Sequence, residues 1–537
     1  MRAIYAQADR VIVWLGEAIE NGDNALRTIH HFAKDQSHLL AQSGGTSNDA
    51  CLKLLQREWF QRIWVLQEVG VARCISMVCG SVQINGHVFC EGLGALGHSL
   101  NLPRTIRPVV HLIRGALFRS SYEIDSRGTL AIGELLDMYH NHHATILQDK
   151  LYALLGLSVE YANNTALKPN YRLPWNDVFK KVAMHVFPGI CSVKTWPEIP
   201  VAVIEGRGWI LGYVDSVEQS TSKYGYQQIN INYNHVARLL GYNDIWGNQW
   251  TLQASAEPIQ EGNIIFLLQG SPRPIIIELC NDHFTVIVST VTLQSEGNAK
   301  IPDMVPAQNS FTIQKSVNDI YMTWKLSLAD KESNSGLRYQ RELNSVAPHY
   351  QEKDSAKAKR LHSTSHIVGD IIIQILKKED FEDQMRYLLQ QCGESLPIPQ
   401  DVVKAAAADE GHGYIILRQL CIHFGKSLNI SEEVVQAAAV NIEDRYRIIY
   451  ELRECFKESL SIFKNIVKVA VINYRNRYSI IYQLREYFRK SLSISKDIVK
   501  AVVINKENRY RIIYLLYKYF RESLSISKDI VKAVTVN

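Results

Sequence analysis

The pattern of apolar and polar positions repeats along the last third of the chain. A Ser-Leu pair recurs every 32 residues, each time with Ile two positions after the Leu. It stands at Ser395, Ser427, Ser459, Ser491 and Ser523. In one unit, Ile449, Leu452 and Phe456 lie at helical spacing, and a second apolar run follows the Ser-Leu connector around Ile466. Two helices per unit at a fixed period predict a stacked α-solenoid over residues 371–537, since such units bury their apolar faces only against their neighbours.

The remaining chain changes its pattern twice. Residues 1–200 mix a strand-like run at 11–15 with helical patterns such as the one at 149–155, which predicts an α/β region. Residues 201–295 carry short β-prone runs separated by Gly, Pro and Asn, which predict a small antiparallel sheet or barrel. These runs are 208–214, 263–268, 274–279 and 284–288. Residues 296–370 are polar and are interpreted as a linker that is helical in part. The expected fold class is therefore α+β and multidomain.

Composition narrows the class of protein. The chain has 537 residues, 46% of them apolar and 21% charged, which excludes wholesale disorder. Nine scattered cysteines, an odd number, favour a reducing compartment over a disulfide scaffold. The N-terminal segment lacks the apolar core of a signal peptide, and no apolar run reaches the roughly 18 residues of a membrane span. We therefore expect a cytoplasmic protein.

The net charge of +5 is unevenly distributed, because residues 475–537 hold 14 basic and 5 acidic residues. The candidate partner-binding residues of this stretch are Arg475, Arg477, Arg489, Lys490, Arg509 and Arg511. A basic face on the repeats could bind a partner, or it could be the solvated outer face of the solenoid. Tyrosines in this stretch recur in register with the helical core, which favours packing over nucleic-acid binding. A protein partner on the concave surface is the expected ligand, and self-association stays open.

The densest cluster of aromatic and polar residues lies at 57–68. On a helix, Trp64 and Glu68 are four residues apart and share a face. A carboxylate beside an indole is partly desolvated, which raises its pKa and suits proton handling or ribose binding. Arg62 is close enough in sequence to pair with Glu58 or with a carboxylate on a neighbouring element. The alternative is an amphipathic core helix with a structural ion pair.

This cluster also carries a family resemblance. The run W-F-x-R-I-W-V-x-Q-E-V-x-x-A-R from residue 59 to residue 73 resembles the central motif of the fungal heterokaryon-incompatibility (HET) domain. Similar segments lie before it, at 4–16, and after it, at 149–157 and 167–171, while 261–270 is similar to the β-rich region that follows HET domains. The motif residues are Trp59, Arg62, Trp64, Gln67, Gly80, Asp149, Tyr152 and Gly156.

The resemblance implies a role in the regulated cell death that follows fusion of incompatible fungal cells. HET domains have been compared with the TIR fold, a flavodoxin-like parallel sheet, and some TIR domains cleave NAD with a glutamate in a W-x-x-x-E context. Trp64 and Glu68 have this spacing, so Glu68 is the candidate catalytic carboxylate. NAD would then be a substrate, and no cofactor is expected. The alternatives are a degenerate HET protein that acts only through its repeats and an NAD-cleaving effector.

Two departures from the family pattern bear on this interpretation. The family domain normally begins with an A-L-S-Y-x-W-G-like strand and a W-I-D-A-x-C-I-N-Q-like strand and turn, and the present sequence starts after both. We therefore expect a HET region without its first strands and with an exposed apolar edge. Asn170 also stands where the family usually has Asp before Tyr171.

Other chemical motifs are weaker. His140, His142 and His143 are dense enough to suggest a metal, but no further ligand follows at suitable spacing, so a solvated helix end is expected. The cysteines at 74, 79 and 90 with the histidine at 87 fit no common zinc spacing and are interpreted as buried thiols, so no metal site is predicted. The Gly-Lys-Ser run at 425–427 is a repeat connector and not a phosphate-binding loop.

Overall fold

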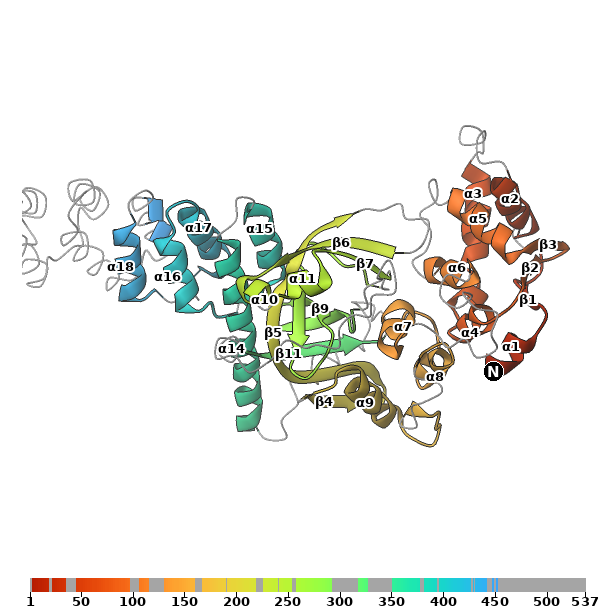
Figure 1. Cartoon of the computed structure of the whole chain (residues 1–537), viewed down its shortest axis with the longest axis horizontal. Helices are drawn as coiled ribbons and strands as arrows, with labels where there is room; N and C mark the ends of the chain where they lie inside the picture. The colour runs from red at the N-terminus through yellow and green to blue at the C-terminus, as the bar shows by residue number, and fades with distance from the viewer. Residues whose placement is uncertain are drawn as a thin grey trace, which may run out of the picture. The chain divides into compact units, whose positions relative to one another are not determined.

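A computed structural model of the chain describes residues 2–18, 22–34, 45–96, 106–114, 130–159, 167–189, 191–218, 226–239, 241–253, 257–291, 317–326, 350–376, 381–393, 396–425, 428, 430–441, 447–448 and 451–452. The chain divides into two compact units, the first made of Met1–Leu279 with His283–Arg360 and the second of Cys280–Asp282 with Leu361–Asn537. Figure 1 labels their helices and strands, which confirm a mixed α/β, multidomain class.

The first sheet of unit one has three strands, in the order β1-β2-β3. They are β1 (Val11–Trp14), β2 (Ile75–Cys79) and β3 (Val82–Asn85). β1 runs parallel to β2, and β3 returns antiparallel. The inner face is buried, with α2 (Gly22–Lys34) and α5 (Gly86–Leu96) in contact with the sheet.

The outer face of β1 is open. The alternation of its four residues buries Val11 and Val13, whereas Ile12 and Trp14 are 66% and 51% exposed. Within the described residues β1 pairs only with β2, so it is an edge strand with an apolar outer face. The strand expected at 11–15 and the exposed apolar edge are both present.

Helices account for the rest of this N-terminal region. They are α1 (Arg2–Gln7), α3 (Gly45–Leu55), the 3-10 helix η2 (Glu58–Gln61), α4 (Trp64–Gly70), α6 (Ile106–Arg114), α7 (Ile132–Tyr139), α8 (Asp149–Leu155) and α9 (Trp175–Val186). Arg62 is extended, with φ −78° and ψ 133°, so it separates η2 from α4. The motif around Trp64 and Glu68 is therefore one short α-helix that is preceded by a 3-10 turn and an extended residue.

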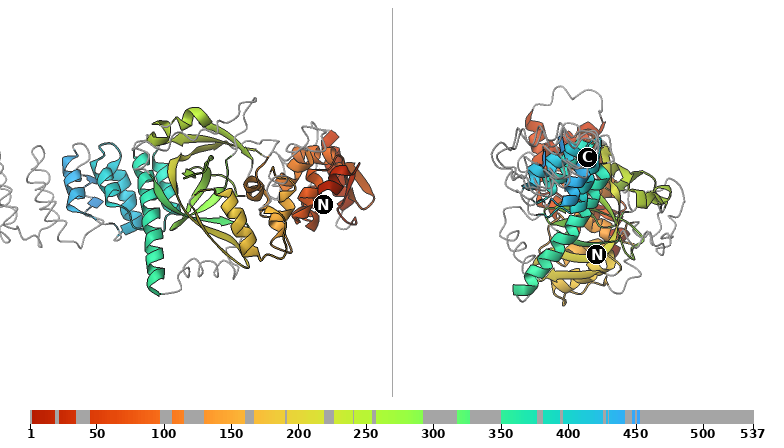
Figure 2. Two further views of the ribbon diagram at one scale, coloured as in Figure 1. Left: turned by 60° about the horizontal axis from the view of Figure 1, so that its bottom comes forward. Right: turned by 90° about the vertical axis from the view of Figure 1, so that its left-hand side faces the viewer.

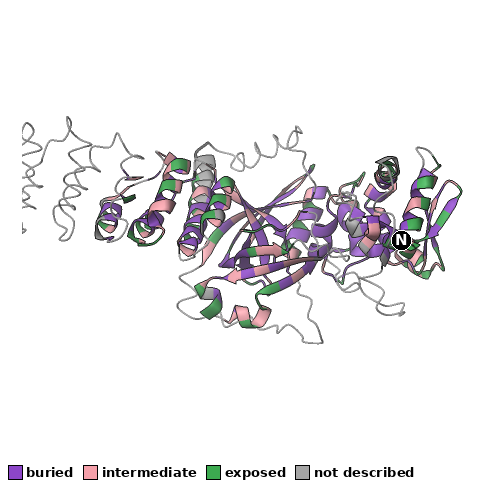
Figure 3. Ribbon diagram, turned by 90° about the horizontal axis from the view of Figure 1, so that it is seen from above, coloured by how far each residue is buried: buried purple, intermediate pink, exposed green. Residues whose placement is uncertain are grey.

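A second, larger sheet follows. Its strands are β4 (Ser192–Trp196), β5 (Ile199–Glu218), β6 (Tyr226–Tyr233), β7 (Gln249–Gln253), β8 (Ile264–Leu268), β9 (Ile275–Cys280), β10 (His283–Val288) and β11 (Asn318–Lys325). The order is β11-β10-β9-β8-β5-β6-β7, with β4 also paired to β5. β11 pairs back to β5, so five of the strands close on themselves, as two further views show (Figure 2). Burial colouring shows that buried positions fill these strands (Figure 3).

The 20-residue strand β5 belongs to both parts of this sheet. Its first half pairs with β4 and β11, and its second half pairs with β6. The pairing register shifts between Ile210 and Gly212 and again between Val214 and Ser216, which lets the strand bend. A Cβ on Gly208 or Gly212 would collide with a carbonyl oxygen of the adjacent strand, so glycine is required at both positions.

The sequence prediction of this sheet was partial. The four β-prone runs correspond to the middle of β5 and to β8, β9 and β10. The expected antiparallel pairing is present between β5 and β8 and between β8 and β9, whereas β11, which lies outside the predicted runs, pairs parallel to β10. β11 lies inside 296–370, the stretch interpreted as a linker, and α14 (Tyr350–Ile375) supplies its helix. The boundaries at residues 200, 295 and 370 stay predictions.

The described part of the second unit is mainly helical. α14 enters it at Leu361, and the described residues beyond it form α15 (Phe381–Gln391), α16 (Gln400–Ala408), α17 (Gly413–Phe424) and α18 (Glu432–Val440). α15 and α17 begin 32 residues apart, as do α16 and α18, so the sequence period is a helix-pair period. Leu388, Leu420 and Leu452 keep this spacing and are all buried. Among the described residues, none of the helices combines the length and apolarity needed to span a membrane.

Candidate functional site

A buried side-chain contact joins the central motif, residues 59–73, to the motif of α8, residues 149–157. Gln67 on α4 is buried and donates its Nε2–H to the carbonyl oxygen of Ala153, at 3.2 Å. Gly156 follows directly after α8, and a Cβ there would collide with the Gln67 amide. The two motif residues Gln67 and Gly156 are therefore explained by one contact, because the amide occupies the space that a side chain at 156 would need.

Glu68 is the next residue along α4 and lies on its half-exposed side, together with Trp64 at the start of the helix. Its carboxylate accepts a hydrogen bond from the Tyr5 hydroxyl of α1, and the guanidinium of Arg62 acts on both groups. Burial raises the pKa of Glu68, while Arg62 and the Tyr5 hydrogen bond lower it. Burial and the Glu68 carboxylate raise the pKa of Tyr5. We name Tyr5, Arg62 and Glu68 the Glu68 cluster.

The sequence had identified two of these three residues, Arg62 and Glu68, as candidates. The pKa shift expected for Glu68 has the expected direction, and burial is its largest cause. Arg62 acts on a carboxylate of the following helix, which was one of its two expected partners. Tyr5 was missed as a member of the cluster, although it lies in the 4–16 segment that resembles the family. What the cluster offers chemically is a half-buried carboxylate, a phenol that hydrogen-bonds to it and a fixed positive charge.

The aromatic half of the motif is structural. The Trp59 ring meets Phe60 edge-on, with centroids 5.0 Å apart, and Phe60 stacks on Phe89 of α5. Phe60 and Phe89 are fully buried. Phe60 therefore anchors η2 to the core of the N-terminal region, with Trp59 packed edge-on against it.

A second arginine, Arg57, bridges the ends of the parallel strands β1 and β2. Its guanidinium donates to the Leu15 carbonyl oxygen at 2.5 Å and contacts the Cys79 thiol at 3.4 Å. Gly80 follows β2 with a φ of +54° and packs against Ala18, so this motif glycine is required by backbone geometry and by space. Sequence reasoning missed Arg57, whose only signal was its position two residues before Trp59.

The motif residues Asp149 and Tyr152 bind the segment around Asn170. The Tyr171 hydroxyl donates to Asp149 Oδ1 at 2.7 Å, and the Tyr152 hydroxyl donates to the Asn170 carbonyl oxygen at 3.1 Å. The Asn170 side chain accepts from the backbone N–H of Arg172 at 3.0 Å. An aspartate could accept the same bond, so the departure from the family pattern at residue 170 keeps this turn.

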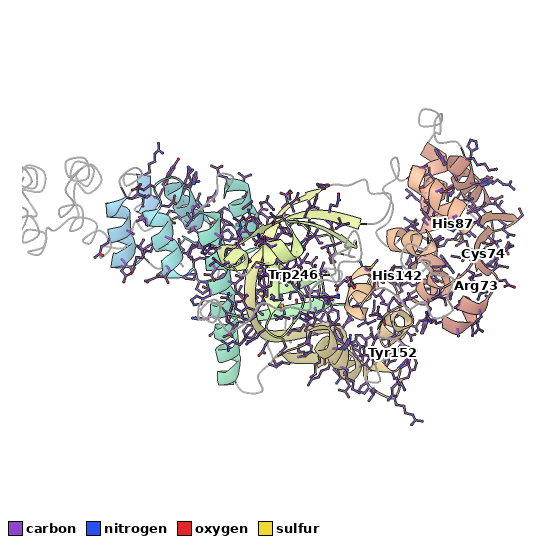
Figure 4. All side chains as sticks on the ribbon, viewed as in Figure 1. Arg73, Cys74, His87, His142, Tyr152 and Trp246 are labelled. Atoms are coloured by element: carbon purple, nitrogen blue, oxygen red, sulfur yellow. The ribbon has the colours of Figure 1, made fainter. Side chains whose placement is uncertain are left out.

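The prediction of a solvated helix end at the three histidines was wrong for two of them. His140 and His142 are buried, and burial lowers the pKa of each to about 4. The buried ammonium of Lys150 donates to their backbone carbonyl oxygens, at 2.6 Å and 3.0 Å. Lys150 thereby satisfies the carbonyls at the end of α7, which a sequence pattern could not show. His143 is exposed as expected, and Figure 4 labels His142 after α7 and Tyr152 on α8.

The joint between α7 and the large sheet was also missed. Asp137 on α7 is fully buried and accepts three hydrogen bonds, from the Ser289 N–H at 2.6 Å, the Ser289 hydroxyl at 2.8 Å and the Trp324 indole at 3.2 Å. Burial raises the pKa of Asp137 to about 7, against the effect of these three donors. The only sequence signal was a second carboxylate, after Glu134, in a mostly apolar helix.

The remaining candidates give a simple picture. Cys79 and Cys90 are buried thiols as expected, while Cys74 is half-buried and His87 exposed. Within the described ranges, no three His, Cys, Asp or Glu side chains come together as a metal site. Gly425 ends α17 with a φ of +47°, and the two connector residues after it lie outside the described residues, as do all six candidate basic residues from 475 to 511.

Two sequence families match parts of the chain. The model of the heterokaryon incompatibility protein (HET) family matches residues 1–68, and that of a domain of unknown function (DUF7104) matches residues 388–416 and 424–444. No curated protein and no solved structure matches the chain. The resemblance of the N-terminal region to HET proteins is thereby confirmed, and it suggests a function related to heterokaryon incompatibility. The HET match contains the whole Glu68 cluster and ends on Glu68.

Proposed function

We propose that this protein is a cytoplasmic regulator of heterokaryon-incompatibility type, which acts in fungal non-self recognition and programmed cell death. The observation that carries the proposal is the HET family match over residues 1–68, within which Tyr5, Arg62 and Glu68 converge. Buried side chains that join one motif to another, such as Gln67 of α4 bonded to Ala153 of α8, make this region a defined scaffold for the cluster. The parallel pairing of β1 with β2, flanked by helices, supports a TIR-like fold for the region.

The second half of the proposal concerns the repeats. We propose that the helix pairs continue as an α-solenoid through residues 371–537 and that this array binds a protein partner. The 32-residue offset between α15 and α17 supports the array. The basic residues between Arg475 and Arg511 are the proposed contact points, because they give the last units a positive charge. In this scheme the repeats bind the protein partner, and the HET-like region then triggers the cell-death response.

The test is inducible expression of the full chain in a filamentous fungus, with cell death scored by a vital dye. We expect death from the parent chain and from Glu58→Gln, a control with an exposed glutamate in η2. Glu68→Gln and Tyr5→Phe should both reduce killing, since each weakens the Glu68 cluster without a large change in volume. Absence of death from the parent chain, at protein levels checked by immunoblot, would overturn the cell-death role and favour a degenerate protein that acts only through its repeats.

A second candidate function is NAD cleavage, which the half-buried carboxylate of Glu68 favours. In that reaction the carboxylate would hold the ribose hydroxyls and stabilise the positive charge that develops as nicotinamide leaves. The test is nicotinamide release from NAD by the purified chain, with Glu68→Ala and Glu58→Ala in parallel. Turnover that survives Glu68→Ala contradicts this candidate, and killing without turnover leaves the first proposal as the sole function.

A further inference from the structure

Two histidines line up on one side of α14, within the second unit. His362 and His366 are both exposed and lie four residues apart, and Asp370 continues the same line one turn later. The opposite side of this part of the helix is buried. Its buried side chains are Thr364, Ile367, Val368, Ile371, Ile372 and Ile375. The helix therefore presents a polar stripe whose position is fixed by its apolar face.

The backbone under the stripe is held firmly. Thr364 donates its hydroxyl to the carbonyl oxygen of Asp282 at 2.8 Å. A Cβ on Gly369 would lie 2.8 Å from a Val402 methyl group, so α14 packs closely on α16 there. Because α14 is held on both sides of His366, binding of a ligand to the polar stripe costs little conformational entropy of the backbone.

The two imidazoles point at each other. Their Nε2 atoms lie 3.3 Å apart, and the ring centroids are 4.4 Å apart with the planes 57° from one another. Two imidazole nitrogens that bind one tetrahedral zinc ion at about 2.0–2.1 Å lie about 3.3–3.4 Å from each other. Without an ion the two nitrogens share a hydrogen bond, and their spacing equals the spacing that a shared ion would need.

We propose that His362 and His366 form a binding site for a divalent transition-metal ion of the imidazole-binding class, Zn²⁺, Ni²⁺ or Cu²⁺. Two ligands four residues apart on a helix chelate the ion, and the stiff helix holds them in place. No third His, Cys, Asp or Glu joins them within the described residues, so water or a group from a bound molecule fills the other positions. The site is thus open, as in metal centres that accept an external ligand.

The test is calorimetric titration of the tag-free full chain with Zn²⁺ and, separately, with Ni²⁺. The variants are His362→Gln, His366→Gln and, as a matched control, His235→Gln, which removes an exposed histidine of the first unit. We expect one ion per chain at the pair. Either pair variant should weaken it at least about ten-fold, because the second imidazole is no longer held at high effective concentration.

The control separates this site from the free thiols, which also bind these metals. The His235→Gln variant should bind as the parent chain does, and circular dichroism should show equal helix content in all variants. Equal affinity of His366→Gln and His235→Gln for both ions would overturn the proposal, as would a parent chain that binds neither ion at millimolar concentration.

Discussion

Asp137 is the residue at which the described structure makes its most quantitative prediction. Its carboxylate is the acceptor for two groups of Ser289 and for the indole of Trp324, and all three donors are buried. Asp137→Ala leaves them without this acceptor. Since each buried unsatisfied group costs about 1–3 kcal/mol, the variant should lose at least about 3 kcal/mol at this joint. Asp137→Asn keeps an acceptor for Ser289 and should lose less.

The same carboxylate makes the joint sensitive to pH. Burial raises the pKa of Asp137 from 3.8 to about 7. Between these values the folded protein keeps a proton that the unfolded chain has released, so this stabilisation is fully present below about pH 4 and is lost as the pH rises through 7. At about 1.4 kcal/mol per pKa unit, the loss is on the order of 4 kcal/mol. Asp137→Asn should abolish this pH dependence.

Hydrogen exchange measured by mass spectrometry suits this prediction, because it reports the free energy of local opening in a multidomain chain. Peptides that cover α7 and β11 are compared between pH 5 and pH 7.5, after correction for the intrinsic rate. The control is Asp177→Asn, which changes an exposed carboxylate on α9. An Asp137→Asn variant with the same pH slope as the parent chain would refute the assignment of that slope to Asp137.

Three further predictions concern buried contacts of the first unit. Gly92→Ala should lower the free energy of unfolding by about 1–3 kcal/mol, because its Cβ would meet the Ile29 carbonyl oxygen of α2; an unchanged thermal midpoint would contradict this. Lys150→Met should remove a rise in stability between about pH 8 and pH 10.5, since burial lowers the pKa of Lys150 to about 8 and the folded state releases its proton first; urea unfolding at both pH values measures this. Gly156→Ala should displace Gln67 and speed hydrogen exchange in α4, and exchange at the parent rate would argue against the contact.

A repeat and a local apolar run predicted elements of the fold. The 32-residue period anticipated the helix pairs of the second unit, and the strand-like run at residues 11–15 anticipated β1. Glu68 could be singled out because a family motif and a helical spacing agree on it. These signals lie within one element or in a fixed repeat, so they can be detected without knowing which distant residues meet in the fold.

Long-range partners left no such signal. Tyr5 reaches Glu68 from 63 residues upstream, and Asp137 finds Trp324 across 187 residues. β11 was missed because its strand is isolated in a polar stretch and is stabilised by pairing with β5. The buried histidines were misjudged although their partner is near in sequence, since Lys150 satisfies their carbonyls only after α8 has packed beside α7.

The closure of the large sheet by β11 sets an order of events during synthesis. The first half of β5 leaves the ribosome more than a hundred residues before β11, its neighbour in the closed sheet. Asp137 likewise waits for Trp324 across 187 residues, which at 5–20 residues per second is roughly 10–40 s. During that interval the first half of β5 has an unpaired edge. The carboxylate of Asp137 on α7, which is buried in the folded protein, is still exposed to water. The joint between α7 and the large sheet, and the closed part of that sheet, therefore form only once the residues of β11 have been synthesised.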